Sequence, residues 1–184
     1  MRLFVAIPCP PAHPVATALL TDLPPMSWRL VPPERRHVTL RFLGEVSERR
    51  VPSIADGLAK LTGPPAFPLT VQGMGAFPDL HRPDVLWLGC GDGGRSLAQL
   101  AESVRSVLGL GPERRDFHGH LTVARRRHER SPAEAAASLE DALPQWRSAF
   151  WGTVMVDRLQ LFRSDLFPDG PRYAPLATVR LPLP

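Results

Sequence analysis

Two copies of a short pattern, His-x-Thr, hold the side chains best suited to chemistry in this sequence. They occupy residues 37–39 and 120–122. Imidazole can give or take a proton near neutral pH, because its ordinary pKa lies close to that pH. A threonine hydroxyl can donate a hydrogen bond to an oxygen on which negative charge develops. Two imidazoles and two hydroxyls around one small anion would suit phosphodiester hydrolysis without a metal, with one histidine as base and the other as acid.

A β-strand would place each histidine beside its threonine. Residues i and i+2 of a strand point to the same face. His37 and Thr39 would therefore share one face, while Val38 pointed to the core. His120 and Thr122 would be arranged in the same way. If the two strands face each other, all four polar side chains line one cleft. The alternative is that both histidines are partly buried strand residues with only local hydrogen bonds.

Arg125 follows the second copy and is a candidate ligand for the phosphate, because a guanidinium can bind two oxygens at once. Strict alternation would put Arg125 on the face opposite His120, so it needs a bend to reach the site. The basic run over residues 125–130 is either a track for RNA phosphates or a solvated loop. Arg35 and Arg36, just before His37, leave the same two alternatives open.

The composition limits the other classes of function. The net charge of +4 favours anionic partners, although Lys60 is the only lysine and so strong a preference for arginine can also follow codon usage. Cys9 and Cys90 lack the spacing of metal ligands or of a disulfide framework. No metal or cofactor is therefore expected. The N-terminal apolar run is too short for a signal peptide, and no stretch approaches a membrane span. We expect a cytoplasmic protein without a membrane anchor.

Hydrophobic periodicity predicts an α+β fold with largely antiparallel sheets. Each half carries a strand with His-x-Thr followed by a helix, which suggests two pseudo-symmetric lobes within one domain, residues 1–184. Ser131 begins a capping box, so a helix should start there. The other helices are expected over residues 15–20, 51–61 and 97–108. The expected strands cover residues 3–7, 38–43, 67–72, 85–88, 120–124, 153–162 and 173–181.

The chain resembles the two-histidine phosphoesterase superfamily, and within it the RNA 2′,3′-cyclic phosphodiesterases, also called 2′-5′ RNA ligases. Residues 37–44 and 117–125 resemble the two motifs of that superfamily. Further likeness extends over nearly the whole chain, at residues 28–34, 75–78, 85–89, Ser164 and 170–173.

The resemblance implies two lobes with the active-site cleft between them, and hydrolysis of an RNA 2′,3′-cyclic phosphate end to a 2′-phosphate. Carried over by motif, His37 would be the general acid and His120 the general base. Thr39, Thr122 and Arg125 would hold the phosphate. The partner implied is RNA with a 2′,3′-cyclic phosphate end, and no obligate protein partner is indicated.

One departure from the family pattern lies at Gly119, where proline is frequent. Glycine should loosen the backbone before His120 and leaves His118 as a bystander or a supporting group. Among the aromatic residues, Trp28 and Phe77 are expected to stack on a base, whereas Phe42 and Trp87 are expected in the core.

Three alternatives concern the reaction itself. The substrate could be a small cyclic nucleotide or another cyclic phosphate instead of RNA. The protein could bind RNA ends without turning them over, although a binder has no need of an acid–base pair. The same site also permits the reverse reaction, ligation to a 2′-5′ linkage.

Overall fold

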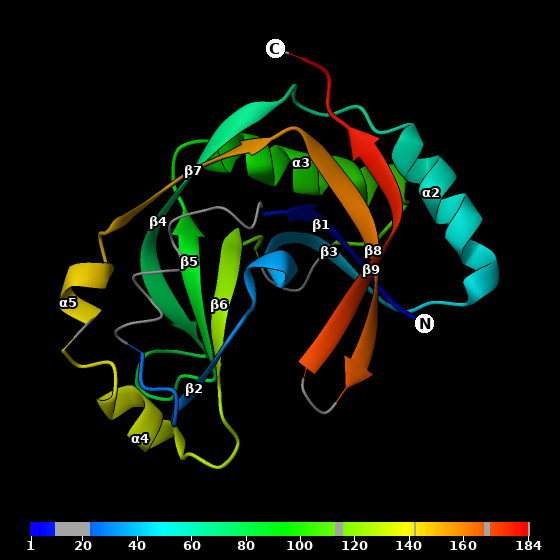
Figure 1. Ribbon diagram of the computed structural model, residues 1–184. Coiled ribbons are helices and arrows are strands. Elements are labelled where there is room, and N and C mark those ends of the chain that lie inside the picture. The colour runs from blue at the N-terminus through cyan, green and yellow to red at the C-terminus, as the bar shows by residue number, and fades with distance from the viewer. Residues whose placement is uncertain (10–22, 113–115, 142, 168–169, 184) are drawn as a thin grey trace.

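The computed structural model describes residues 1–9, 23–112, 116–141, 143–167 and 170–183 (Figure 1). The helix expected over residues 15–20 lies outside these ranges. In chain order the elements are β1 (Arg2–Pro8), β2 (Trp28–Leu30), η1 (Pro33–Arg35), β3 (His37–Glu45), η2 (Glu48–Arg50), α2 (Val51–Ala59), β4 (Phe67–Phe77), β5 (Val85–Cys90), α3 (Gly94–Val107), β6 (His120–Arg126), α4 (Pro132–Ala137), α5 (Leu143–Trp146), β7 (Phe150–Val156), β8 (Arg158–Phe167) and β9 (Gly170–Arg180).

The nine strands of the described residues lie in one sheet, in the order β7-β4-β5-β6-β3-β1-β8-β9, with β2 beside β6. All the strand pairs are antiparallel. The two predicted lobes are the two halves of this sheet. One half holds β6, β5, β4 and β7, and the other holds β3, β1, β8 and β9. The predicted α+β class with largely antiparallel pairing is confirmed.

The two halves meet where β3 touches β6. Within the described residues, they pair at one antiparallel position, Val38 with Leu121. Beyond that pair the strands separate, and β2 pairs with β6 instead, with Leu30 opposite Ala124 and Trp28 opposite Arg126. The sheet therefore opens between β3 and β2, next to both His-x-Thr segments.

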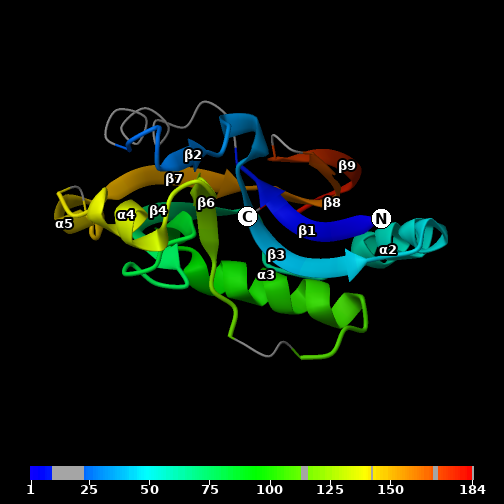
Figure 2. The same ribbon diagram turned by 90° about the horizontal axis from the view of Figure 1, so that it is seen from below.

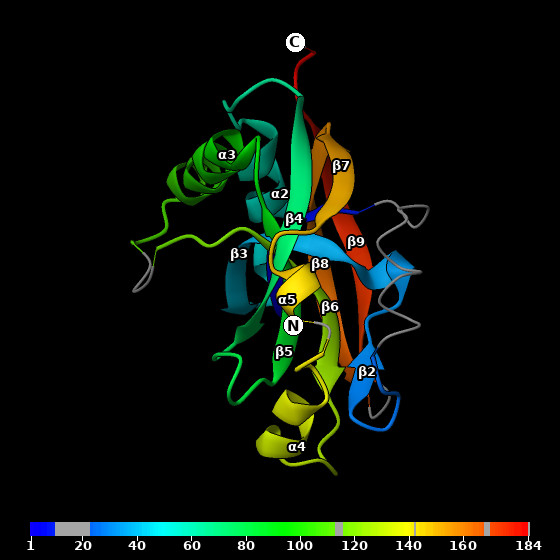
Figure 3. The ribbon, with the colours of Figure 1, turned by 90° about the vertical axis from the view of Figure 1, so that its left-hand side faces the viewer.

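Helix α3 covers the apolar face of the sheet, while β2 lies on the opposite side (Figures 2 and 3). The buried residues of α3 recur at helical spacing: Leu97, Leu100, Ala101 and Val104. Each fully buried leucine contributes about 2 kcal/mol by leaving water. The predicted capping box is present as well, because Ser131 accepts from the backbone of Glu134 and the Glu134 carboxylate accepts from the backbone of Ser131. Helix α3 thus supports the strands from behind and leaves their other face to a ligand.

The element boundaries differ from the expectation in three places. Strand β4 continues to Phe77 through a register shift between Gln72 and Met74, where Gly73 takes a φ of 65°. The single strand expected over residues 153–162 is two strands, β7 and β8, which separate at Asp157. The three-residue strand β2 was not expected, because its few residues carry no alternation that a periodicity argument can detect.

Candidate active site

Both His-x-Thr segments alternate as predicted. In β3, Val38 and Leu40 are buried, while His37 and Thr39 are only partly buried. Strand β6 begins in the same way, with His120 and Thr122 partly buried and Leu121 buried. The apolar residues of each strand face the core, so each histidine and its threonine share the other face.

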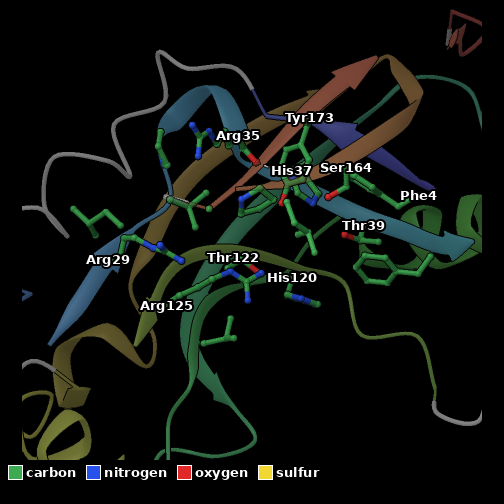
Figure 4. A pocket seen from close by; sticks show the side chains of 18 of the residues that line it. Phe4, Arg29, Arg35, His37, Thr39, His120, Thr122, Arg125, Ser164 and Tyr173 are labelled. Carbon is green, nitrogen blue, oxygen red and sulfur yellow. Dashed lines mark hydrogen bonds between the residues drawn. The ribbon is translucent and has the colours of Figure 1, made fainter. Parts of the chain in front are cut away.

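That face borders a pocket of about 790 Å³. All five residues predicted for the site line it (Figure 4): His37, Thr39, His120, Thr122 and Arg125. The structure therefore brings together side chains from two strands that are far apart in sequence. Arginines are prominent in the wall, and no Asp or Glu occurs among its residues in the described part of the chain. The remaining lining residues are Arg2, Phe4, Arg29, Leu30, Val31, Pro32, Arg35, Phe42, Phe77, Val85, Ser164, Leu166, Gly170, Pro171 and Tyr173.

The two imidazoles are held in the same way. His37 Nδ1 lies 2.8 Å from the carbonyl oxygen of Arg35, and His120 Nδ1 lies 2.7 Å from that of His118. A carbonyl oxygen can only accept, so in both rings Nδ1 must carry the proton. This fixes the tautomer and leaves Nε2 as the nitrogen available to a ligand. Nε2 is a proton acceptor when the ring is neutral and a donor when it is charged.

The surroundings lower the pKa of both histidines. Burial lowers the pKa of His37 to about 4, the carbonyl of Arg35 partly opposes this, and the charges of Arg125 and His120 lower it further. Burial also lowers the pKa of His120, opposed by the carbonyl of His118 and assisted by the charges of His118 and Arg125. The protein's own groups thus favour two neutral imidazoles, and an anion placed between them would favour their protonation.

Aromatic rings support each imidazole. His37 packs at 4.9 Å from Phe4 and edge-on at 5.1 Å from Tyr173. His120 packs edge-on at 4.9 Å from Phe77. These contacts restrict the rotation of the rings, so Nε2 is held in place before a ligand arrives.

A β-bulge brings Arg125 to the pocket. Leu86 and Trp87 of β5 are adjacent, yet they pair with Ala124 and Thr122 of β6, so β6 carries one extra residue there. Val123 and Ala124 are both buried as a result, and the alternation resumes one residue later. Arg125 therefore points to the same side as Thr122 and lines the pocket. The bend that the sequence required for Arg125 is this bulge.

Gly119 is required by space more than by backbone freedom. A Cβ at this position would lie 2.5 Å from Cδ2 of Leu97 and 3.5 Å from Sγ of Cys90. His120, next in the chain, is paired with Gly89 in β5 and is bonded to the carbonyl of His118. The looser geometry expected at His120 is therefore not what the structure shows. His118 supports the second imidazole through its carbonyl and does not line the pocket.

Most of the neighbouring basic run is engaged elsewhere. Arg126 forms an ion pair with Asp84 at 2.7 Å, and Arg127 donates to the carbonyl of Pro25 at 2.8 Å. Arg130 pairs with Glu134 at 3.2 Å. Arg36 is buried and donates to the carbonyl of Val31 at 3.0 Å. These contacts favour the structural interpretation for all four, whereas Arg125 and Arg35 line the pocket.

Two expectations about aromatic residues were wrong. Trp28 is 2% exposed and donates its indole N–H to Ser138 Oγ at 3.0 Å, so it is a core residue and cannot stack on a base. Phe42 is 62% exposed and lines the pocket, because β3 carries one extra residue opposite Val5 and Ala6 of β1, which puts Phe42 on the same face as Thr39. Phe77 lines the pocket, and its stacking on a base stays a prediction; Trp87 is partly buried and packs against Phe77 at 5.3 Å.

Sequence reasoning did not assign a role to several pocket residues. Arg2 lies opposite Ser164 in the pairing of β1 with β8. Ser164 in turn lies opposite Tyr173 in the pairing of β8 with β9. Arg29 lies opposite Arg125 in the pairing of β2 with β6. These juxtapositions depend on the strand order, which no local pattern reveals.

Within the described ranges, His, Cys, Asp and Glu side chains form no group of three or more that could hold a metal ion. Among the same residues, no helix has both the length and the apolar character needed to cross a membrane.

Comparison with known proteins places the chain in a family. The model of the 2′-5′ RNA ligase superfamily matches residues 9–166. An RNA 2′,3′-cyclic phosphodiesterase of Archaeoglobus fulgidus is 37% identical over 180 residues, covering 96% of this chain and 98% of that protein. The protein of that name from Escherichia coli is 32% identical over 180 residues, covering 95% and 93%.

The fold is shared with solved structures. The apo form of Escherichia coli LigT superposes with a TM-score of 0.75 at 27% identity, covering 98% of this chain and 97% of that chain. These matches extend over both halves of the sheet and both His-x-Thr segments. The chain belongs to the 2′-5′ RNA ligase superfamily.

Proposed function

We propose that this chain hydrolyses RNA 2′,3′-cyclic phosphate ends to 2′-phosphates, without a metal ion or cofactor. The observation that carries the proposal is one pocket lined by two imidazoles, each with Nδ1 bonded to a backbone carbonyl and with Nε2 unbonded to any described residue. The names of its relatives support the same activity.

In the proposed reaction, His120 acts as the base and His37 as the acid, as the family resemblance implies. His120 Nε2 takes a proton from water, and the hydroxide formed attacks phosphorus. The bond from phosphorus to the ribose 3′ oxygen breaks, and His37 Nε2 gives its proton to that oxygen. The product carries a free 3′ hydroxyl and a 2′-phosphate. The two histidines end in the opposite protonation states and exchange a proton through solvent to start again.

Thr39, Thr122 and Arg125 would hold the phosphate. The hydroxyls donate to its non-bridging oxygens, and the guanidinium balances the charge that grows as water attacks. The anionic substrate also acts on the protonation of His37. Its negative charge beside the buried ring raises the pKa of His37 and favours the protonated form that the acid requires.

The direct test uses a short RNA with a 2′,3′-cyclic phosphate end, in buffer that contains EDTA. The proposal expects turnover to a 2′-phosphate, identified as an end that a general phosphomonoesterase removes and a phosphatase specific for 3′-phosphates does not. Binding without turnover would favour the RNA-end binding module. Activity that required an added metal would contradict the proposed chemistry.

The size of the pocket favours a substrate of at least one nucleotide, because about 790 Å³ lies in the upper range of small-molecule sites. A small cyclic nucleotide would also fit a pocket of this volume and remains the second candidate substrate. Comparison of the hydrolysis rates on RNA and on mononucleotides separates the two candidates. Reverse ligation to a 2′-5′ linkage would use the same two proton transfers in the opposite order.

A single domain over residues 1–184 and a cytoplasmic location remain predictions.

A further inference from the structure

Two arginines converge in the pocket beside Gly170. Arg29 on β2 and Arg35 at the end of η1 both line it. A Cβ built on Gly170 would lie 3.6 Å from Nη1 of Arg35 and 3.9 Å from Nη1 of Arg29. Both guanidinium groups therefore approach the same point, beside the start of β9.

Among the described residues, neither guanidinium has a partner of opposite charge. Arg29 and Arg35 take part in no side-chain hydrogen bond or ion pair with the described residues, in contrast to Arg126, which is paired with Asp84. Both are only partly exposed. Two half-buried like charges repel each other, and an anion between them would remove that cost.

A third arginine connects this cluster to the proposed reaction centre. Arg29 lies directly opposite Arg125 in the antiparallel pairing of β2 with β6. Side chains opposite each other in such a pair are neighbours on one face of the sheet, and like charges there are destabilising. Arg35 lies two residues before His37, and its carbonyl fixes the ring. Figure 4 shows Arg29 next to Arg125. In that view Arg29 and Arg35 both lie to the left of His37.

We infer that Arg29 and Arg35 form a second phosphate subsite, which binds the phosphate on the 5′ oxygen of the terminal nucleoside. This inference rests on the proposed function, since Arg125 and the histidines hold the cyclic phosphate. In RNA the occupant is the last internucleotide phosphodiester. Two guanidiniums suit it because each can bind its oxygens with a pair of N–H groups. The pocket of about 790 Å³ has room for the ribose that joins the two phosphates and for its base.

The subsite makes the enzyme selective for RNA over a free nucleoside cyclic phosphate. The test compares kcat/KM on four substrates that share one terminal base. They are the 2′,3′-cyclic phosphate with a 5′ hydroxyl, the same with a 5′ phosphate, a dinucleotide, and a dinucleotide with an uncharged methylphosphonate linkage. We expect the 5′-phosphorylated nucleotide and the ordinary dinucleotide to react about tenfold faster or more than the other two, as hydrogen bonds to a charged group imply.

Arg29→Gln and Arg35→Gln should abolish this gain, which is measured within each protein as the ratio of kcat/KM with a 5′ phosphate to kcat/KM with a 5′ hydroxyl. Arg95→Gln is the matched control, because it removes the same charge from an exposed position on α3, on the other face of the sheet. The salt dependence offers a second readout, since one phosphate contact to a single strand contributes about 0.7 to the slope of log kcat/KM against log salt. Each of the two variants should lower that slope for the dinucleotide, whereas the control should not.

Three results would overturn the inference. The wild type could react equally fast on all four substrates. The methylphosphonate dinucleotide could match the ordinary one, which would show that the base or sugar is recognised and not the charge. The two variants could also lose activity equally on every substrate, which would place both arginines at the cyclic phosphate.

Calorimetry separates a failure of this inference from a failure of the proposed function. It compares binding of a nucleoside 2′,5′-bisphosphate and of the 2′-monophosphate to the wild type and to each variant. If no cyclic phosphate is turned over, but the bisphosphate binds more tightly to the wild type only, the subsite stands and the hydrolysis does not. Equal affinity for the two ligands contradicts the subsite even when hydrolysis is observed.

Discussion

Val38 and Leu121, the middle residues of the two His-x-Thr segments, form the antiparallel pair at which β3 meets β6. His37 and Thr39 flank Val38, His120 and Thr122 flank Leu121, and all four side chains line the pocket. The two segments are related by a local twofold axis that passes through the Val38–Leu121 pair. This relationship explains how two short segments form one anion site.

The local twofold predicts that the two hydroxyls matter equally. Thr39→Val and Thr122→Val keep the side-chain shape and remove one donor to the phosphate. Each should lower kcat by about 10²-fold, the cost of losing one donor to a developing oxyanion. Thr153→Val, at an exposed position on β7, is the control and should keep the wild-type kcat. A large loss in only one of the two variants would show that the symmetry of the backbone does not extend to the chemistry.

The pH dependence should differ between kcat/KM and kcat. Burial lowers the pKa of both histidines, to about 4 for His37, so the free enzyme loses its protonated acid as pH rises through the acidic range. The profile of kcat/KM reports the free enzyme, and its optimum should lie below the ordinary histidine pKa of 6.5. The profile of kcat reports the complex, where the phosphate raises both pKa values, and its optimum should lie at higher pH. Steady-state rates from pH 4 to 9 measure both, and coincident optima would contradict the electrostatic account.

The buried His37 should also affect stability. Its pKa of about 4 in the folded protein is below the ordinary 6.5, so the unfolded chain binds this proton more readily. The stability due to neutral His37 is complete above pH 6.5 and is lost as pH falls toward 4, by at most about 3 kcal/mol. His37→Gln removes the titrating group. Urea unfolding at pH 7 and pH 4.5 should show a smaller loss of unfolding free energy in this variant than in the wild type. An identical loss in both proteins would place His37 in a solvated setting.

The space at Gly119 predicts a specific sensitivity. Gly119→Ala would bring a methyl group to 2.5 Å from Leu97 Cδ2, and should lower the free energy of unfolding by about 1–3 kcal/mol through overpacking. Gly111→Ala is the matched control, because a Cβ there meets nothing within 4 Å. Urea denaturation compares the two variants. Equal stabilities would mean that the side chain of Leu97 moves aside at little cost.

The sequence predicted the parts of the site that depend on local alternation. His37, Thr39, His120 and Thr122 follow from the period of two in a strand, together with apolar neighbours that must face the core. Arg125 could be identified as a candidate, but its position could not be predicted. A bulge is a mismatch between two paired strands, and the sequence of one strand alone does not reveal it. Trp28 was misjudged for a similar reason. Its surroundings in sequence look like a loop, whereas Ser138, which accepts its indole N–H, lies 110 residues away.

The arginines of the second subsite show the same limit. Arg29 belongs to a strand of three residues, and its position opposite Arg125 follows only from the strand order. Arg35 could be suspected from its place before His37, yet Arg36 next to it is buried with a backbone partner. Of the adjacent arginines Arg35 and Arg36, the first lines the pocket and the second is structural, because their side chains point to opposite sides of the chain.

The central claim is that His37 and His120 carry the two proton transfers. It is tested most directly by the rate of hydrolysis of an RNA 2′,3′-cyclic phosphate by His37→Ala, His120→Ala and the double variant, with folding checked by circular dichroism. Each single variant should lose at least about 10²-fold in kcat, and the double variant little more than the single ones, because acid and base act as a unit. Turnover near the wild-type rate in folded His37→Ala and His120→Ala protein would contradict the account.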